Sequence, residues 1–328
     1  MHTYLITGGA GFIGSSLARA LIARGDRVRI IDDFSSGKRE NLVDIASRIE
    51  LVEGSILDDA ALARAVAGVE VVFHEAAIAS VPRSLAEPIE NHAVNATGTL
   101  KVLDAARRAG VRRVVYAASS AAYGDEPTLP KVETMVPAPI SPYGASKLAG
   151  ELYCQVYASA FAMETVCLRY FNVFGPRQDP QSEYAAVIPK FITRALMGGT
   201  PVIFGDGSQS RDFCFIDNVI EANLKAAQVP GASGGVYNVA CGMPTTLNEV
   251  VTMIGHALGR PLAARHDPER SGDIRHSVAD ISAARDQLGY TANVSFADGL
   301  RRTVAWYRRI MSVSGALPAT NHPCVLGA

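Results

Sequence analysis

The stretch Thr7-Gly8-Gly9-Ala10-Gly11-Phe12-Ile13-Gly14 decides the fold of this 328-residue chain. It joins an apolar run, Tyr4–Thr7, to a stretch of helical composition, Gly11–Arg24. Gly8 permits a tight turn, Gly11 lets a pyrophosphate approach the backbone closely, and Gly14 lets the helix pack closely on the strand. The helix start adds unpaired N–H groups that attract phosphate oxygens. The stretch therefore predicts a site for a dinucleotide.

The first half of the chain alternates apolar runs with helical stretches. The runs are Tyr4–Thr7, Val28–Asp32, Ile49–Glu53, Val69–Glu75, Arg113–Ser119 and Thr165–Tyr170. The helical stretches are Gly11–Arg24, Asp59–Val66, Pro88–Gly110 and Tyr143–Phe161. The runs lack strict polar–apolar alternation, which is typical of parallel strands buried on both faces. This order predicts an α/β fold with a Rossmann-type, doubly wound parallel sheet.

The pattern changes after Phe171, where loops lengthen and glycine and proline separate shorter elements. Helices are predicted at Val187–Met197, Asn218–Gln228, Leu247–Leu258 and Phe296–Arg309. We expect residues 1–171 to form the dinucleotide-binding domain, which later segments near 211–228 rejoin. Residues 172–310 are expected to form a smaller, interleaved C-terminal α/β lobe that binds the substrate. Residues 311–328 lack periodicity and are expected to be a mobile tail.

The composition excludes several classes of function. The formal net charge is −1, so no broad basic field favours a nucleic acid as partner. No apolar run reaches membrane-spanning length, and the first residues have neither a basic region nor a cleavage site. The five cysteines are scattered without metal-ligand spacing, so no metal site is expected. A soluble protein of the reducing cytoplasm fits these features.

Asp32 indicates which dinucleotide binds. It ends the second predicted strand, 18 residues after Gly14. A carboxylate there accepts hydrogen bonds from the adenosine ribose hydroxyls and repels a 2′-phosphate, so it favours NAD over NADP. Arg39 is the nearby residue that would weaken this preference. The turn that contains Ser36 and Gly37 either contacts the same ribose or phosphate or is a plain turn.

The spacing Tyr143-Gly-Ala-Ser-Lys147 suits acid–base chemistry. On a helix these two side chains share one face and reach the same ligand. A tyrosine has an ordinary pKa of about 10, and a neighbouring ammonium lowers it. A third hydroxyl, from Ser119 or Ser120, follows the strand run that starts at Arg113. Ligands of doubly wound sheets bind at this end of the strands.

Together these motifs resemble the NAD-dependent nucleotide-sugar epimerase/dehydratase family, within the extended short-chain dehydrogenases/reductases. The resemblance covers residues 3–310 and is most specific for UDP-N-acetylglucosamine 4-epimerases. It rests on the glycine stretch, Asp32, the serine loop and the Tyr143/Lys147 pair, and on the segments Val94-Asn95, Arg169–Asn172, Ser80–Ser84, Phe171–Gly175, Arg177–Pro180, Tyr184–Pro189, Ser210–Phe213 and Ser271–Ser277.

The resemblance implies Ser119 as the catalytic hydroxyl, Tyr143 as the acid/base and Lys147 as its partner. It also implies a set of NAD-binding residues: Gly8, Gly11, Phe12, Ile13, Gly14, Asp32, Ser36, Gly37, Ser55, Ile56, Ala76, Ala77, Asn95, Tyr143, Lys147 and Tyr170. Two departures are informative. Dehydratases of the family carry Asp-Glu where this chain has Ser120-Ala121, so the groups that eliminate water are missing. Epimerases of the family commonly carry Asp where this chain has Ser55. The serine should bind the adenine amino group more weakly than the aspartate does.

The family pattern also implies how a UDP-sugar is held. The substrate-binding residues would be Ser80, Ser119, Ser120, Tyr143, Asn172, Gln178, Val187, Phe204, Arg211, Arg270, Asp273 and Ser277. Phe204 would stack on uracil, and Arg211 and Arg270 would bind the diphosphate. A tyrosine matches Ser277 in glucose-restricted relatives, so the serine leaves room for an N-acetyl group.

The function implied is a UDP-hexose 4-epimerase that interconverts UDP-N-acetylglucosamine and UDP-N-acetylgalactosamine and also accepts UDP-glucose and UDP-galactose. It would oxidise carbon 4 transiently with tightly bound NAD, in nucleotide-sugar and polysaccharide metabolism. The alternatives are UDP-glucuronate 4-epimerase, another UDP-sugar-modifying enzyme, and a non-catalytic NAD sensor. The family also implies a homodimer paired through the helices at Pro88–Gly110 and Tyr143–Phe161.

Overall fold

The computed structural model describes residues 2–180, 187–269 and 274–313. The expected substrate residues Arg270 and Asp273 lie outside this part, as does the expected tail from residue 314 onward. Residues 184–186 of the segment Tyr184–Pro189 also lie outside it.

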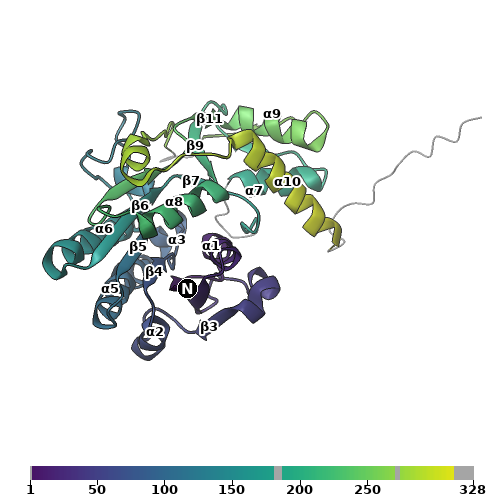
Figure 1. Cartoon of the computed structure of the whole chain (residues 1–328). Helices are drawn as coiled ribbons and strands as arrows, with labels where there is room; N and C mark the ends of the chain where they lie inside the picture. Colours follow the sequence, from purple (N-terminus) through teal and green to yellow (C-terminus); the bar gives the residue numbers. More distant parts are fainter. Residues whose placement is uncertain (1, 181–186, 270–273, 314–328) are drawn as a thin grey trace, which may run out of the picture.

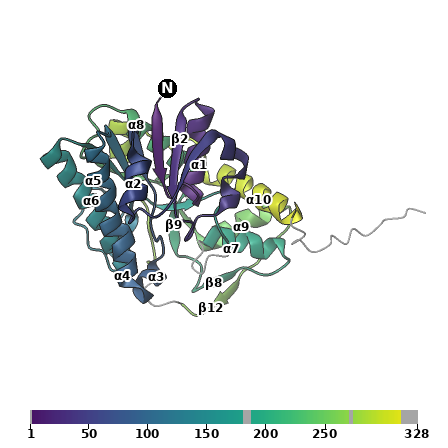
Figure 2. The same cartoon turned by 90° about the horizontal axis from the view of Figure 1, so that it is seen from below.

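A seven-stranded sheet forms the centre of the molecule, in the order β10-β6-β5-β4-β1-β2-β3 (Figures 1 and 2). Its strands are β1 (Thr3–Thr7), β2 (Arg27–Asp32), β3 (Ile49–Glu53), β4 (Val71–His74), β5 (Arg113–Ser119), β6 (Glu164–Tyr170) and β10 (Val236–Val239). Every neighbouring pair is parallel. The strand order reverses between β1 and β4. The predicted doubly wound Rossmann-type sheet is confirmed.

Helices cover both faces of the sheet (Figure 2). The helices of the described residues are α1 (Phe12–Ala23), α2 (Asp59–Val66), α3 (Val81–Ala86), α4 (Pro88–His92), α5 (Gly98–Arg108), α6 (Pro142–Phe161), α7 (Val187–Leu196), α8 (Ile216–Gln228), α9 (Leu247–Leu258) and α10 (Phe296–Val313). Short 3₁₀ turns lie at Arg39–Asn41, Val43–Arg48 and Ser120–Tyr123, and π-helical turns lie at Ala93–Thr97 and Ala284–Leu288.

Two differences from the sequence prediction concern helix ends. The predicted helix Pro88–Gly110 is divided by the π-helical turn Ala93–Thr97, which contains Asn95. The last helix runs to Val313, so the first residues of the predicted tail, 311–313, are helical. Extending an existing helix costs little because each added residue gains a hydrogen bond.

Alternate residues of the strands enter two cores. Leu5 of β1 packs with residues of α2, α5 and α6 on one face. Its neighbour Ile6 packs with residues of α1 and α8 on the other face. The second core continues without a break into α7, α9 and α10, for example through Ile188 and Leu300. The sheet and the smaller lobe therefore share one hydrophobic core.

The smaller lobe holds two further sheets. One contains β11 (Pro244–Thr246), β9 (Ser210–Phe215) and β7 (Asn172–Phe174), in that order. The other pairs β12 (Arg265–Asp267) with β8 (Val202–Phe204) in parallel. From this lobe the chain returns to the main sheet, first as α8, which packs on β5 and β6, and then as β10.

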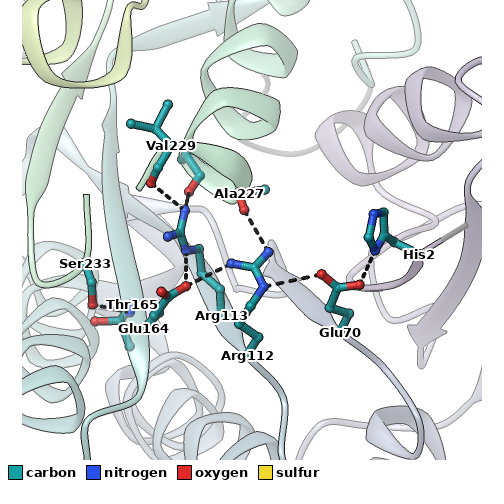
Figure 3. A network of polar contacts seen from close by, with 10 residues as sticks. His2, Glu70, Arg112, Arg113, Glu164, Thr165, Ala227, Val229 and Ser233 are labelled. Atoms are coloured by element: carbon teal, nitrogen blue, oxygen red, sulfur yellow. Dashed lines mark hydrogen bonds and ion pairs between the residues drawn. The ribbon is translucent and has the colours of Figure 1, made fainter. Parts of the chain in front are cut away.

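An ionic network ties the amino ends of the strands to the end of α8 (Figure 3). Glu70, which His2 also contacts, binds Arg112, and Glu164 binds Arg112 and Arg113 at 2.9 and 2.8 Å. The Arg113 guanidinium, 1% exposed, also donates to the carbonyls of Ala226 and Val229 at 2.7 and 3.0 Å. Structural contacts thus occupy the amino ends of the strands, and the carboxyl ends lie on the opposite side of the sheet.

Candidate active site

A cavity of about 530 Å³ lies at the carboxyl ends of β1, β2 and β4. Its wall contains most of the predicted cofactor residues: Gly8, Gly11, Phe12, Ile13, Gly14, Asp32, Ser36, Gly37, Ser55, Ile56, Ala76 and Ala77. Lys38, Glu75, Arg83, Arg177 and Asp179 also line it. Of these strands, β1 and β4 flank the switch point of the sheet, where doubly wound folds bind their ligands.

The glycines of the fingerprint leave a cradle that side chains would fill. A Cβ atom on Gly14 would lie 2.4 Å from the Gly8 carbonyl oxygen. Gly8 has φ +67°, and a Cβ atom there would lie 2.8 Å from the backbone of Ala76. The turn therefore exposes backbone N–H groups at the start of α1, and the cradle fits a dinucleotide pyrophosphate.

Asp32 fixes the wall where the adenosine ribose is expected. Its Oδ2 accepts the N–H of Ala10 at 2.8 Å, and its Oδ1 accepts that of Phe34 at 2.9 Å. Burial raises the pKa of Asp32, and these two hydrogen bonds oppose the rise. Each carboxylate oxygen keeps a second lone pair, so the group still fits two ribose hydroxyls. A Cβ on Gly37 would lie 2.6 Å from Oδ1 and would crowd this group.

Asn95 supports the cavity from outside its wall. Its Oδ1 accepts the Ile78 N–H at 2.8 Å, and its Nδ2 donates to the Ile78 carbonyl at 3.1 Å. Nδ2 also donates to the Ser146 hydroxyl at 3.1 Å. Ile78 lines the cavity, whereas Asn95 does not. The other predicted cofactor residues outside the lining are Tyr143, Lys147 and Tyr170.

Ser119 and Tyr143 meet beside the end of β5. Helix α6 places Tyr143 in its first turn, because Ser141 caps that helix by accepting the Gly144 N–H at 3.1 Å. The Tyr143 side chain lies close enough to Ser119 for the serine to lower its pKa, and the Ser119 hydroxyl accepts the Ala121 N–H at 3.1 Å. Burial raises the pKa of Tyr143, and Ser119 lowers it by less.

Burial has the largest effect on the pKa of Tyr143, whereas the spacing from Lys147 predicted a lowered pKa. The ammonium group lies 4.8 Å from the centre of the Tyr116 ring. Burial lowers the pKa of Lys147 to about 8, and the negative charge of Glu75 opposes this effect.

Glu75 is a site residue that the sequence analysis did not assign. It directly follows β4, lines the cofactor cavity and accepts the Tyr170 hydroxyl at 2.9 Å. Asn223 in turn donates to the Tyr170 oxygen at 2.7 Å. Burial raises the pKa of Glu75 to about 7, opposed by Tyr170 and by Lys147. An acidic residue at the end of an apolar strand run was the available signal.

A second cavity, of about 700 Å³, lies in the smaller lobe. Four of the predicted substrate residues line it, namely Asn172, Val187, Phe204 and Arg211, beside apolar side chains such as Phe191. Its aromatic and aliphatic wall with a few polar groups is typical of a small-molecule site.

Other predicted substrate residues lie outside this lining: Ser80, Ser119, Ser120, Tyr143, Gln178 and Ser277. Ser80 caps α3 by accepting the Arg83 N–H at 3.1 Å, and Gln178 donates to the Val173 carbonyl at 3.0 Å. The Ser277 N–H binds the carbonyl of Ser210, next to Arg211.

Among residues 2–180, 187–269 and 274–313 there is no cluster of His, Cys, Asp or Glu that could hold a metal ion. In the same ranges no helix is both long and apolar enough to cross a membrane.

The parallel sheet, its dinucleotide cradle and the Ser119–Tyr143 contact define an enzyme of the extended short-chain dehydrogenase/reductase type. Residues 4–240 match the model of the NAD-dependent epimerase/dehydratase family. The chain belongs to this family, uses NAD and is of the isomerase class.

Individual relatives extend along the whole fold. A UDP-glucose 4-epimerase of Mycolicibacterium smegmatis is 41% identical over 308 residues, which cover 93% of this chain and 98% of the relative. The solved UDP-N-acetylglucosamine 4-epimerase of Methanobrevibacter ruminantium, in complex with UDP-N-acetylmuramic acid, is 41% identical, with a TM-score of 0.90 and coverage of 94% and 99%. The UDP-glucose 4-epimerase of Thermus thermophilus, solved with NAD, is 36% identical, with a TM-score of 0.84 and coverage of 93% and 99%.

Proposed function

We propose that this protein is a UDP-hexose 4-epimerase that accepts N-acetylated sugars, interconverting UDP-N-acetylglucosamine and UDP-N-acetylgalactosamine. The observation that carries the proposal is that Ser119 and Tyr143 lie together at the end of β5, and that Ser119 is followed by Ser120 and Ala121. A hydroxyl pair suffices to move a proton at a sugar oxygen. Elimination of water needs a further acid and base, and these two positions do not supply them.

In this mechanism Tyr143 accepts the proton of the 4-hydroxyl group and later returns it. Ser119 hydrogen-bonds the same oxygen and orients it toward Tyr143. Lys147, held near Glu75, contributes positive charge that favours the phenolate when the substrate binds. NAD, when bound, supplies the oxidant for carbon 4, and the reaction has no net redox change.

The second cavity supports binding of the uridine and diphosphate. Phe204 offers a ring for the uracil, and Arg211 offers a planar cation for phosphate oxygens. The Arg211 guanidinium donates to the carbonyls of Ser210 and Arg275 at 2.9 and 3.2 Å, which restrict its orientation. Arg270 and Asp273 complete this proposed set, by family resemblance.

The small side chain of Ser277 supports the proposal that the N-acetyl group has space in the substrate site. Its N–H donates to the carbonyl of Ser210, the first residue of β9, so Ser277 lies beside the start of that strand, next to Arg211. Removing bulk admits the larger sugar without excluding the smaller one, so we expect UDP-glucose to react as well.

The test compares turnover of UDP-N-acetylglucosamine and UDP-glucose by wild type, Ser277→Tyr and, as a matched control, Ser277→Ala. We expect both substrates to react with wild type and Ser277→Ala, and only UDP-glucose to react with Ser277→Tyr. Failure of wild type to convert UDP-N-acetylglucosamine would contradict the proposal. So would turnover of UDP-glucuronate alone, which would favour the glucuronate 4-epimerase.

We also propose a homodimer, supported by an apolar surface on α3, α4 and α6. Leu85 and Ile89 are 63% and 82% exposed, and Leu152 and Val156, one turn apart on α6, are 52% and 50% exposed. These helices contact one another, so the exposed apolar residues stand on neighbouring elements. Light scattering of wild type and of Leu152→Glu tests this: we expect a dimer and a monomer, respectively. A monomeric wild type would contradict it.

A further inference from the structure

Three cations line the cofactor cavity within the part of the chain that the structure describes: Lys38, Arg83 and Arg177. Two of them are neutralised. Lys38 Nζ lies 2.8 Å from Asp179, and Arg83 lies 2.9 Å from both Glu87 and Glu90.

Arg177 is different. No described carboxylate lies within ion-pair distance of its guanidinium, which donates from Nη2 to the Ser16 hydroxyl at 3.2 Å. Its Nε is buried and has no hydrogen-bond partner among the described residues. Burial lowers the pKa of Arg177, and the charge of Arg19 adds to this effect. A half-buried cation with an unused donor is costly to keep, and a bound anion relieves the cost.

The position of Arg177 indicates which anion. Ser16 belongs to the first turns of α1, immediately after the glycine cradle that fits the pyrophosphate. The loop after β7 reaches this helix closely, since a Cβ on Gly175 would lie 3.5 Å from the Phe12 ring. Arg177 itself has φ +71°, a conformation that non-glycine residues adopt rarely and mainly at functional sites.

We propose that Arg177 binds the pyrophosphate of NAD, facing the N–H groups at the start of α1. A guanidinium donates two parallel hydrogen bonds to phosphate oxygens and stays charged when buried. Because Arg177 belongs to the loop that leaves β7, the smaller lobe clamps the cofactor as well as the substrate. Retention of NAD therefore depends on a residue outside the glycine fingerprint.

The substrate diphosphate is the competing ligand. Arg177 lines the cofactor cavity and is not among the residues that line the cavity of the smaller lobe. The NAD pyrophosphate is therefore the anion within its reach, and the experiment includes UDP to separate the two.

The test measures NAD content per purified subunit, and the affinities of ADP-ribose and UDP for protein stripped of NAD. The variants are Arg177→Gln, Arg177→Lys and the control Arg19→Gln. Arg19 also contacts the start of α1, through the Ser15 carbonyl, but does not line the cavity. We expect Arg177→Gln to weaken ADP-ribose about 10- to 100-fold, the effect of losing a charge-assisted contact. Arg177→Lys should lose less, and UDP affinity should be unchanged.

Wild-type NAD content and ADP-ribose affinity in Arg177→Gln would overturn the proposal. So would an equal loss of UDP affinity, which would assign Arg177 to the substrate. Circular dichroism of each variant guards against misfolding. If Arg177→Gln unfolds, Arg177→Lys alone must still show weaker ADP-ribose binding with unchanged UDP binding. These readouts do not require epimerase activity, so they stand apart from the proposed function.

Discussion

The Tyr170 hydroxyl donates a 2.9 Å hydrogen bond to Glu75, which holds a carboxylate in the wall of the cofactor cavity. Glu75 opposes the effect of burial on Lys147, whose pKa is about 8, while Lys147 and Tyr170 oppose the effect of burial on Glu75. The proposed catalytic lysine thus has a charged partner, and its protonation depends on that partner.

This pair predicts an effect of Glu75→Gln on the pH profile. In wild type we expect kcat/KM to fall above about pH 8, as Lys147 loses its proton. Removing the carboxylate charge removes the influence that raises the Lys147 pKa, so the alkaline limb should move to lower pH. Measuring kcat/KM from pH 6 to 10 for both proteins tests this. An unchanged alkaline limb would show that Glu75 does not control Lys147.

The same substitution should change stability in a pH-dependent way. Glu75 has its pKa raised from 4.5 to about 7 on folding, so the native state holds a proton that the unfolded state releases. The stability contributed by the protonated group is fully present below pH 4.5 and is lost as pH rises through 7. The free energy of unfolding of Glu75→Gln, relative to that of wild type, should therefore rise by up to about 3 kcal/mol between pH 4.5 and 8. Urea unfolding at both pH values measures this, and a constant difference would contradict it.

Tyr143→Phe should reduce epimerase turnover about 10²- to 10⁴-fold, because the proton of the 4-hydroxyl group loses its acceptor. UDP affinity should remain, since Tyr143 does not line the cavity of the smaller lobe. Turnover and UDP titration on the same preparation test both parts. Ser119→Ala is the companion variant, and Tyr143→Phe with near-normal turnover would overturn the catalytic assignment.

Arg113→Met should destabilise the fold by about 1–3 kcal/mol, because it leaves the carbonyls of Ala226 and Val229 at the end of α8 without their buried donor, while Glu164 keeps Arg112 as a partner (Figure 3). Arg112→Met is the matched control. Its side chain is 42% exposed and also binds Glu164, so we expect a loss of about 0–1 kcal/mol. Denaturant unfolding measures both, and equal losses would contradict the prediction.

Most of the sheet could be predicted because its strands are apolar runs that glycine, proline and helical stretches separate. β10 could not, since it has only four residues and follows Gly234-Gly235. It is a strand because it pairs with β6, and the pairing begins with Val236 beside Cys167. Such pairing leaves little local signal.

The same contrast holds at the site. The glycine cradle and Asp32 carry local patterns, so the sequence predicts them. For Glu75 the only local signal is its place at the end of an apolar run, and the partners of Glu75 and Arg177 come from distant segments: Tyr170 for Glu75, and Ser16 for Arg177. The order of pKa effects on Tyr143 likewise required the burial of that side chain, which its spacing from Lys147 does not reveal.

The return of the chain from the smaller lobe to the main sheet has a consequence for engineering. Ending the protein after Phe171 would remove both β10 and α8 and leave β6 as an unpaired outer strand. Bare strand edges recruit other chains and aggregate. The two lobes are therefore not interchangeable modules: grafting a new specificity onto this scaffold requires replacing individual loops and leaving the chain's path intact.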